Sequence, residues 1–305
     1  MARATGPRFH CGARRCDRNG AAMSAVLAVD LGGTWLRTAL VGPDHAIHRR
    51  IGTIPTPPSA PDCVRAIAAA WEAAGRPARL AVAAAPHCDA AGRVIRWPNR
   101  PAYEGEAILP PDFLGQVDIR ILDDAAAAAL AAHPTGTPDK ARETTVTMAI
   151  GTGIGGGAVV GGRLLTGRRG AAMAVGHIKV PAASGLVCAC GEIGCLQAAA
   201  SGRALRRMLG KYDADAFDIF ALPASIRDPV LDRAADAVAE ALAILARLFD
   251  PHRLTICGGL GLSPLFGLCG ERFTASSGWP PPIRHPHGVD ATLIGAARAF
   301  SQTLA

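Results

Sequence analysis

The chain has 305 residues, a length that about two domains of ordinary size would fill. Half of its residues are hydrophobic and 19% are charged, and no run approaches the roughly 18 consecutive apolar residues of a membrane span. This composition excludes a disordered chain and a membrane-spanning one. The net charge is +7, but five arginines lie within residues 1–22, so the remainder is not basic enough to indicate a nucleic-acid binder.

Residues 1–22 are interpreted as a disordered extension from an upstream start, because Met23 immediately precedes a strand. The segment has no apolar stretch of the about 7–15 residues that a secretory signal needs, so we expect a cytoplasmic protein. Two alternatives remain open. Cys11 and Cys16 have the spacing of half a metal knuckle but lack a second pair nearby, and the arginine content is typical of an organellar presequence.

The first half of the chain is predicted to open with strands and to continue with alternating helices and strands. Turns are expected at Gly32–Gly33 and Gly42–Pro43, and an irregular stretch ends near Gly115. Asp62 is expected to cap the first helix. The predicted elements are strands Ala25–Asp30, Trp35–Val41, Ala46–Thr53, Arg79–Ala85 and Ile119–Leu122, with helices Asp62–Ala74 and Asp124–Ala132.

The second half repeats this opening, since a strand, a glycine-rich turn and another strand begin again at Thr144. The repetition predicts a duplicated α/β architecture with a cleft between the halves. The predicted elements are strands Thr144–Ile150, Gly157–Val160, Arg163–Leu165 and Arg253–Ile256, with helices Leu196–Leu209, Pro229–Phe249, Ser263–Phe273 and Ala291–Gln302.

Two glycine turns in equivalent places indicate a polyphosphate site. In the segment from Asp30 to Thr34, an acid at a strand end precedes two glycines and a hydroxyl, so backbone N–H groups can approach an anion. Asp30 can hold Mg²⁺, in our interpretation through water, that bridges phosphate oxygens. Gly151–Gly157 is the second turn, and Gly258–Gly259 can admit a base or ribose. A plain hairpin turn is the alternative for the first segment alone.

His177, Cys188, Cys190 and Cys195 have the spacing H-x10-C-x-C-x4-C, with glycines at 191 and 194 that permit tight turns. Four nitrogen and sulfur ligands without an open position describe a structural tetrahedral zinc site. The alternative is a set of buried free cysteines. Cys63, Cys88, Cys257 and Cys269 are interpreted as small core residues.

Asp123 and Asp124 end an apolar strand and open an alanine-rich helix, at a strand end where α/β proteins form clefts. A carboxylate there can accept the proton of an alcohol that attacks a γ-phosphate, so Asp124 is the candidate base. Helix capping by one of the two acids is the alternative.

These motifs resemble the ROK family of sugar kinases and regulators from about Ala25 to the C-terminus. Asp30–Thr34 and Gly151–Gly157 are similar to its phosphate motifs, Asp123-Asp124-Ala125 stands where the family has Asn-Asp-Ala, and Gly176-His177 with Cys188–Cys195 matches its zinc signature. The resemblance implies an actin-like ATPase (ribonuclease H-like) α/β fold. Its two lobes, 23–122 and 123–290, would enclose a central cleft, the second lobe would carry a zinc-bound loop, and a helix at 291–305 would pack back on the first lobe.

The same resemblance assigns roles to individual residues and implies a homodimer that binds ATP, Mg²⁺, structural Zn²⁺ and a sugar, with no nucleic-acid or membrane partner. Asp124 is the implied catalytic base, and the implied sugar contacts are Asn99, Asp124, His177 and Gln197. The implied zinc ligands are His177, Cys188, Cys190 and Cys195. The implied ATP and magnesium contacts are Ala28, Val29, Asp30, Leu31, Gly32, Gly33, Thr34, Trp35, Gly151, Thr152, Gly153, Ile154, Gly155, Gly156, Gly157, Ala158, Gly258 and Gly259.

Departures from the family pattern bear on the substrate. Family glucokinases carry Gly-Glu-x-Gly-His, whereas this chain reads Met173-Ala174-Val175-Gly176-His177 and so lacks the glutamate that contacts sugar hydroxyls. The N-acetylmannosamine kinases of the family lack it too, and they share the ten-residue gap between His177 and Cys188. We therefore expect phosphorylation of the 6-hydroxyl of N-acetyl-D-mannosamine.

Other readings stay open. Gln197, Asp123 and His87 also depart from the family pattern, which fits another sugar such as glucose, fructose or N-acetylglucosamine, or a sugar-binding protein without activity. A transcription regulator is disfavoured because only 22 residues precede Met23, too few for a helix-turn-helix domain.

Overall fold

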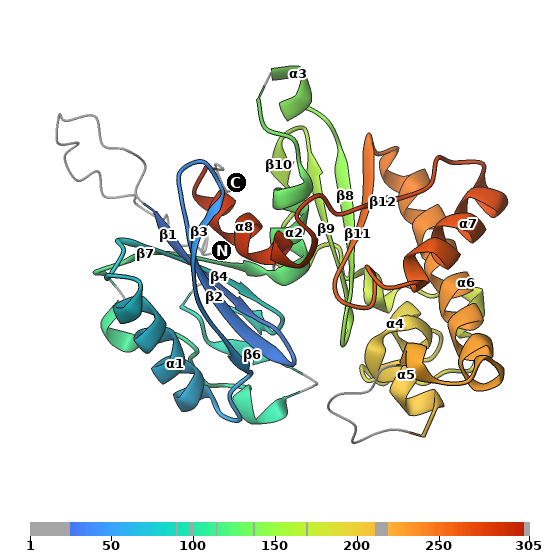
Figure 1. Ribbon diagram of the computed structural model, residues 1–305, viewed down its shortest axis with the longest axis horizontal. Helices are drawn as coiled ribbons and strands as arrows, with labels where there is room; N and C mark the ends of the chain where they lie inside the picture. Colours follow the sequence, from blue (N-terminus) through green and yellow to red (C-terminus); the bar gives the residue numbers. More distant parts are fainter. Residues whose placement is uncertain are drawn as a thin grey trace, which may run out of the picture.

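A computed structural model of the chain describes residues 25–301 apart from 90, 98, 99, 114, 137, 169 and 211–218. Its strands form two five-stranded sheets and one small two-stranded sheet, and helices pack around the two large sheets (Figure 1). The expected extension at residues 1–22 and the expected sugar contact Asn99 lie outside the described residues, as does Gln302 at the end of the last expected helix.

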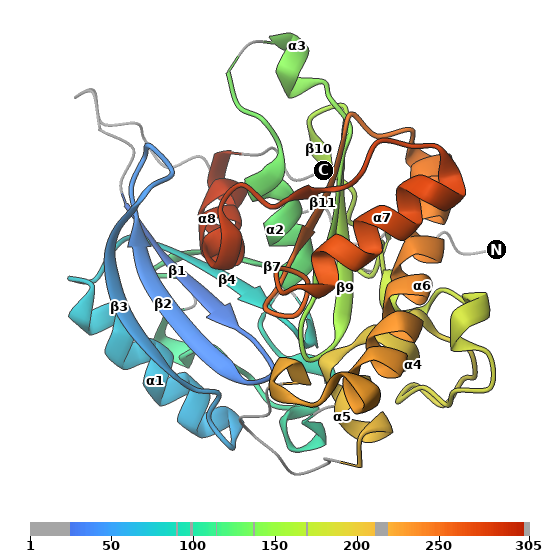
Figure 2. The same cartoon turned by 45° about the vertical axis from the view of Figure 1, so that its right-hand side comes forward.

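The first large sheet has the strand order β3-β2-β1-β4-β7. All six residues of β1 are buried, which explains why the residues before Asp30 are apolar at every position rather than at alternate ones. Helix α1 packs on one face of the sheet, and α8 packs on the other (Figure 2). The bounds are β1 Val26–Leu31, β2 Trp35–Val41, β3 Ile47–Pro55, β4 Arg79–Ala84, β7 Asp118–Asp123, α1 Ala60–Ala73 and α8 Ala291–Arg298.

The second large sheet has the order β10-β9-β8-β11-β12 and repeats the topology of the first. In each sheet the first three strands are antiparallel neighbours, and two parallel strands follow on the other side. The repetition predicted from the sequence is therefore present in the strand order. The bounds are β8 Thr145–Ile150, β9 Ile154–Val160, β10 Arg163–Leu164, β11 Arg253–Cys257 and β12 Ile283–Arg284.

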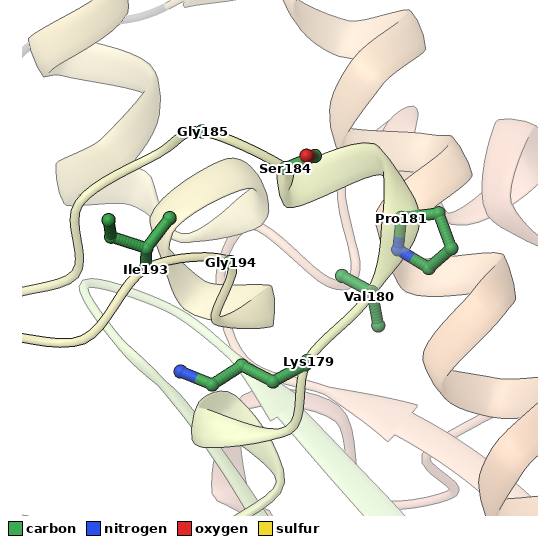
Figure 3. A pocket seen from close by; sticks show the side chains of 7 residues that line it. All are labelled: Lys179, Val180, Pro181, Ser184, Gly185, Ile193 and Gly194. Atoms are coloured by element: carbon green, nitrogen blue, oxygen red, sulfur yellow. The ribbon is translucent and has the colours of Figure 1, made fainter.

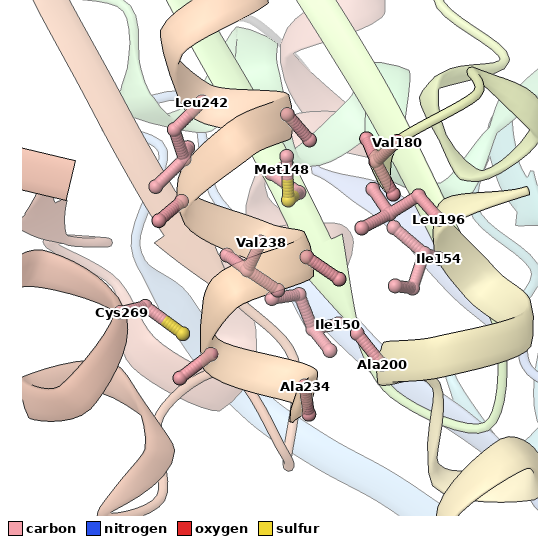
Figure 4. Packing of buried hydrophobic residues seen from close by; sticks show 14 of the residues in the cluster. Met148, Ile150, Ile154, Val180, Leu196, Ala200, Ala234, Val238, Leu242 and Cys269 are labelled. Carbon is pink, nitrogen blue, oxygen red and sulfur yellow. The ribbon is translucent and has the colours of Figure 1, made fainter. Parts of the chain in front are cut away.

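The core of this second half lies between its sheet and the long helix α6, Ala224–Phe249. Figure 4 shows Met148 and Ile150 of β8 against Val238 and Leu242 of α6. Small residues along α6 let it approach the sheet closely, and burial of the larger apolar side chains stabilises the contact by about 1.5–3 kcal/mol each. The other helices here are α4 Leu196–Ala200, α5 Gly202–Met208 and α7 Leu265–Ser277.

Helix α2, Asp124–Ala132, packs between the two halves and contacts α8, β8 and β9 (Figure 1). The crossing with α8 is so close that a Cβ on Gly295 would lie 1.7 Å from the carbonyl oxygen of Ala127. Arg298 of α8 donates from Nη1 to the carbonyl oxygens of Leu130 and Ala131 at 3.1 and 2.8 Å and so satisfies the C-terminal end of α2. These contacts join the C-terminal helix to the centre of the molecule.

The cap of α1 differs from the prediction. The helix begins at Ala60 rather than Asp62, and Ser59 is the N-cap, whose Oγ accepts from the Asp62 N–H at 3.3 Å. Asp62 lies two residues further in, where its carboxylate accepts from the Ser59 hydroxyl at 2.6 Å. Pro61 allows this earlier start because the first turn of a helix needs no donor from it.

The second glycine turn is shorter than predicted. Only residues 151–153 form the turn, and β9 begins at Ile154 rather than Gly157. The following glycines lie in the strand because neighbouring groups approach it closely. A Cβ on Gly156 would lie 2.8 Å from the Val175 side chain, and one on Gly157 would lie 2.5 Å from the Ala125 carbonyl oxygen.

Two helix predictions also need correction. The helix expected over Leu196–Leu209 is broken at Ser201, which caps α5 by accepting from the Ala204 N–H at 3.2 Å. The helix expected from Pro229 begins at Ala224, with Pro229 inside it. Among the helices of the described residues, none combines the length and the apolar character that crossing a bilayer requires. The remaining elements are β5 His87–Cys88, β6 Val94–Arg96 and α3 Pro138–Ala141, with several single 3-10 turns.

Candidate active site

The first glycine turn joins β1 to β2 as a hairpin, with the Gly32 N–H donating to the Trp35 carbonyl oxygen at 3.0 Å. Side chains from other segments donate hydrogen bonds to the carbonyl oxygens of this turn. The Thr56 hydroxyl donates to the Gly32 oxygen at 2.7 Å, and Arg100 donates to the Gly33 oxygen from Nη2 at 3.1 Å. With its carbonyls turned toward these donors, the turn is held in one conformation.

Asp30, which the sequence singled out as a magnesium residue, is buried at the end of β1 beside Arg37. The antiparallel register places the two residues opposite each other, and Arg37 donates to Asp30 Oδ2 from Nε at 2.8 Å and also from Nη2. Burial raises the pKa of Asp30, and Arg37 acts against that rise. Sequence reasoning missed Arg37, although a hairpin turning at 32–35 already sets residue 37 opposite residue 30.

The second turn, Gly151–Gly153, faces the first one. Thr34 Oγ1 lies 3.1 Å from Thr152 Oγ1, although the two residues are 118 positions apart in the chain. Beneath this turn, Gly258 has a φ of 84°, and a Cβ there would lie 2.4 Å from the Ile150 carbonyl oxygen. The third glycine pair thus supports the second turn as well as following β11.

The sequence left open which of Asp123 and Asp124 caps helix α2 and which is available as a base. Asp123 is the N-cap of α2, and its Oδ1 accepts from the N–H groups of Ala125 at 2.9 Å and Ala126 at 3.1 Å. Asp124 is the first helical residue, and its Oδ1 lies 3.7 Å from where a Cβ on Gly155 would be. Since Asp123 does the capping, the Asp124 carboxylate is available for chemistry.

The surroundings of Asp124 make its carboxyl group a better proton acceptor than an exposed aspartate. Removal from water raises its pKa, and the negative charges of Asp123 and Asp30 raise it further, while Arg37 opposes them. A carboxylate whose pKa moves toward neutrality holds a transferred proton more tightly, which general base catalysis requires.

His177, Cys188, Cys190 and Cys195 converge, and their ligand atoms all lie within 4.8 Å of one another. The Cys190 and Cys195 sulfurs are 3.8 Å apart, and Cys188 Sγ is 3.8 Å from His177 Nδ1. Sulfurs bonded at about 2.3 Å to one tetrahedral zinc ion would be separated by about 3.8 Å. The donor set and its spacing therefore suit a metal ion of this kind.

Gln197, an expected sugar contact, lies between this cluster and the second turn. Its Nε2 donates to Cys188 Sγ at 3.3 Å, and its Oε1 would be 3.5 Å from a Cβ on Gly153. Met173, which stands at the glycine position of the family pattern, has a φ of 64°, a region that glycine adopts at less cost.

A hollow of about 330 Å³ lies on the same loop as the cluster, lined by Lys179, Val180, Pro181, Ser184, Gly185, Ile193 and Gly194 (Figure 3). None of these seven lining residues belongs to the two glycine turns or to α2, so the hollow is separate from the expected reaction site.

Comparison with known proteins identifies the family to which this fold and this site belong. The model of the ROK family matches residues 26–301, so the chain belongs to the ROK family.

Relatives in this family have different named activities. The bifunctional enzyme NanE/NanK of Brucella melitensis is 32% identical over 294 residues, which cover 90% of this chain and 53% of the relative. The chain thus spans about half the length of that relative. The N-acetylmannosamine kinase of Salmonella typhi is 32% identical over 296 residues, covering 89% of this chain and 96% of the relative.

Among solved structures, a ROK family glucokinase from Streptomyces griseus in complex with glucose and AMPPNP has a TM-score of 0.71 and 28% identity to this chain. The match covers 90% of this chain and 98% of the glucokinase.

Proposed function

We propose that this protein is an ATP-dependent sugar kinase that transfers the γ-phosphoryl group to the 6-hydroxyl of an amino sugar. Two observations together carry the proposal. The two glycine turns meet at Thr34 and Thr152. Beside them, Asp123 caps helix α2, so the carboxylate of Asp124 does not have to. Membership of a family whose named members include sugar kinases supports the same activity.

In the proposed reaction the glycine turns bind the phosphates of ATP through backbone N–H groups, and Asp124 accepts the proton of the attacking hydroxyl. Positioning and charge stabilisation supply most of the acceleration in phosphoryl transfer. Asp30 fits a hard cation, because its carboxylate lies at the first turn and is fixed by Arg37 at 2.8 Å. There Asp30 would hold Mg²⁺, which would supply positive charge to neutralise the phosphates.

We propose N-acetyl-D-mannosamine as the substrate, with N-acetyl-D-mannosamine 6-phosphate as the product. The support is Ala174, which replaces a glutamate of family glucokinases, and the similarity to the Salmonella typhi enzyme. Glucose is the second candidate, because a glucokinase is also among the similar structures. A homodimer, as is usual in this family, is part of the same proposal.

The test is ATP consumption by the zinc-replete protein in magnesium buffer with N-acetylmannosamine, N-acetylglucosamine, glucose, mannose and fructose side by side. We expect the highest kcat/KM with N-acetylmannosamine.

The Asp124→Asn variant should lose at least about a hundredfold in kcat, since general base catalysis contributes about 10²–10⁴, and should still bind the sugar. Sugar binding without ATP consumption by the unaltered protein would contradict the kinase proposal.

We also propose that the four-residue cluster holds structural Zn²⁺. The variant Cys190→Ser should lose bound zinc and melt at a lower temperature, because metal binding contributes to folding free energy. Cys88→Ser is the control, since Cys88 lies outside the cluster, and it should keep a full zinc content. Elemental analysis and thermal unfolding measure both quantities, and a fully metallated, equally stable Cys190→Ser protein would remove the zinc assignment.

A further inference from the structure

Arg100 connects the segment that follows β6 to the first glycine turn. Its guanidinium donates twice to the Gly33 carbonyl oxygen, from Nε at 3.3 Å and from Nη2 at 3.1 Å. It also donates from Nη1 to the Pro57 carbonyl oxygen at 3.1 Å. Gly33 and Pro57 are 67 and 43 positions from Arg100 in the chain. One side chain therefore joins its own segment to the turn and to the loop before α1.

The residues around Arg100 form a packed unit. Trp97 is buried, its ring packs edge-on against Tyr103 with the ring centroids 4.8 Å apart, and the Arg100 guanidinium lies 5.8 Å from the Trp97 centroid. The Arg100 N–H donates to the Trp97 carbonyl oxygen at 2.8 Å, and the Tyr103 hydroxyl donates to the Pro57 carbonyl oxygen. The backbone and the side chain of Arg100 are thus both fixed, so its contact with the turn has a defined geometry.

The contact sets the direction of one peptide group. The bond between Gly33 and Thr34 is trans, so its carbonyl and its N–H point in opposite directions. Since the Gly33 oxygen is bonded to Arg100, the Thr34 N–H points away from Arg100. Among the described residues this N–H has no hydrogen-bond acceptor, and the Thr34 hydroxyl lies 3.1 Å from that of Thr152. The N–H is therefore a donor of fixed direction that is available to a ligand where the two turns meet.

Arg100 also directly follows Asn99, the residue expected to contact the sugar. A sugar that binds there restricts the motion of this segment, and with it the motion of the Arg100 side chain. The turn that Arg100 holds then loses less conformational entropy when a nucleotide binds. The position of Arg100 thus connects the expected sugar contact to the first phosphate turn.

We propose that Arg100 is a positioning residue that, through the Gly33 carbonyl, holds the Thr34 N–H toward a phosphate oxygen of the nucleotide and makes this orientation depend on the sugar. Sugar binding then tightens nucleotide binding, and by linkage the nucleotide tightens sugar binding by the same factor. The inference rests on the proposed kinase function, because that function brings a nucleotide to the turn and a sugar to the segment of Arg100.

The first test measures the Kd of the magnesium complex of AMPPNP, a nucleotide analogue, by titration calorimetry without sugar. Arg100→Met removes the donors and should raise the Kd at least about tenfold, since hydrogen bonds that involve a charged group are among the stronger ones. Arg100→Lys keeps one donor group and should recover part of the loss. Arg93→Met is the matched control and should bind normally, because the Arg93 guanidinium donates to the Gly105 carbonyl oxygen instead of the turn. An unchanged Kd in Arg100→Met overturns the inference.

Tyr103→Phe separates positioning from general packing. It removes the hydroxyl that donates to the Pro57 carbonyl oxygen and leaves the Arg100 donors to Gly33 in place. This variant should lose stability in denaturant unfolding and keep the Kd of AMPPNP within about twofold of the unaltered protein. A Kd raised as much as in Arg100→Met would mean that loosening the segment suffices, and the positioning role would be wrong.

The same titration in the presence of sugar tests the connection to the sugar side. A saturating concentration of whichever of the five sugars binds most tightly should lower the Kd of AMPPNP at least about fivefold in the unaltered protein and less than about twofold in Arg100→Met. Equal lowering in both proteins, or none in the unaltered one, overturns this connection. If no sugar is phosphorylated but Arg100→Met alone weakens AMPPNP binding, the kinase proposal fails and the positioning of the turn by Arg100 stands.

Discussion

At the scale of single residues, the site contains three aspartates, and each of them has different neighbours. Asp123 accepts two backbone N–H groups at the start of α2, whereas the pKa of Asp124, the next residue, is raised by burial and then by the negative charges of Asp123 and Asp30. Asp30 is held by Arg37 across the hairpin. One carboxylate therefore caps, one is fixed by a cation, and one is left to accept a proton.

Ala174 gives a prediction about specificity at this scale. Its side chain is exposed, so a glutamate has room there, and the double variant Ala174→Glu/Gln197→Glu places a carboxylate at two positions where this chain departs from the family pattern. We expect the ratio of kcat/KM for glucose to that for N-acetylmannosamine to rise at least about tenfold, since a hydrogen bond to a charged acceptor contributes about 1.5–3 kcal/mol.

The control for this prediction is Ala171→Glu, which adds the same charge at another exposed position of the loop. Steady-state kinetics with both sugars measure the ratio. An unchanged ratio in the double variant would mean that position 174 does not set the choice of sugar.

At the scale of elements, α2 is the helix on which the site depends, because its first turn carries Asp124 and its body contacts strands of the second sheet and α8. Small residues make these contacts possible. Gly157 of β9 lies against the Ala125 carbonyl oxygen, and Gly295 of α8 lies against that of Ala127. The alanine-rich sequence of α2 thus serves close packing on several sides.

Gly295→Ala should therefore destabilise the protein by at least about 2 kcal/mol, because a Cβ would lie 1.7 Å from the Ala127 carbonyl oxygen and the two helices would have to separate. Gly267→Ala is the matched control in α7, where no atom lies within 4 Å of the added Cβ. That change should stabilise by up to about 1 kcal/mol through helix propensity. Denaturant unfolding measures both, and equal effects at the two glycines would contradict the packing argument.

At the scale of the whole molecule, two similar sheets are joined through α2 and α8, and His285 adds a further connection. It follows β12, is buried, and its Nε2 lies 2.8 Å from the Ala128 carbonyl oxygen of α2. Its Nδ1 accepts from the His287 N–H at 3.2 Å, so Nε2 carries the proton and the ring is neutral. Burial, helped by the charges of His287 and Arg298 and opposed by the hydrogen bond to Ala128, lowers the pKa of His285 from 6.5 to about 4.

This lowered pKa predicts a loss of stability in mild acid. The unfolded chain binds a proton at His285 near pH 6.5 and the folded protein only near pH 4, so the contribution is present above pH 6.5 and lost as the pH falls toward 4. The full shift corresponds to about 3 kcal/mol. Asp30 and Asp124, whose pKa values are raised, act in the opposite sense.

The measurement is therefore the difference in unfolding free energy between the unaltered protein and His285→Gln from pH 7 to pH 4.5. A glutamine can still donate to Ala128, but it does not titrate. The difference should shift in favour of the variant as the pH falls, and parallel pH profiles would show that His285 does not titrate in this range.

The sequence by itself determined the duplicated α/β architecture, the places of the two glycine turns and the metal-ligand spacing, because strand periodicity and the spacing of glycines and cysteines act over a few residues. Only the tertiary structure decided that Asp123 caps while Asp124 does not, that Arg37 holds Asp30, and that Gly156 and Gly157 are needed for close packing. It also brought Arg100 to the first turn. These outcomes depend on contacts between segments far apart in the chain. Local sequence does not encode which of two adjacent, chemically identical residues, such as Asp123 and Asp124, a distant segment will contact.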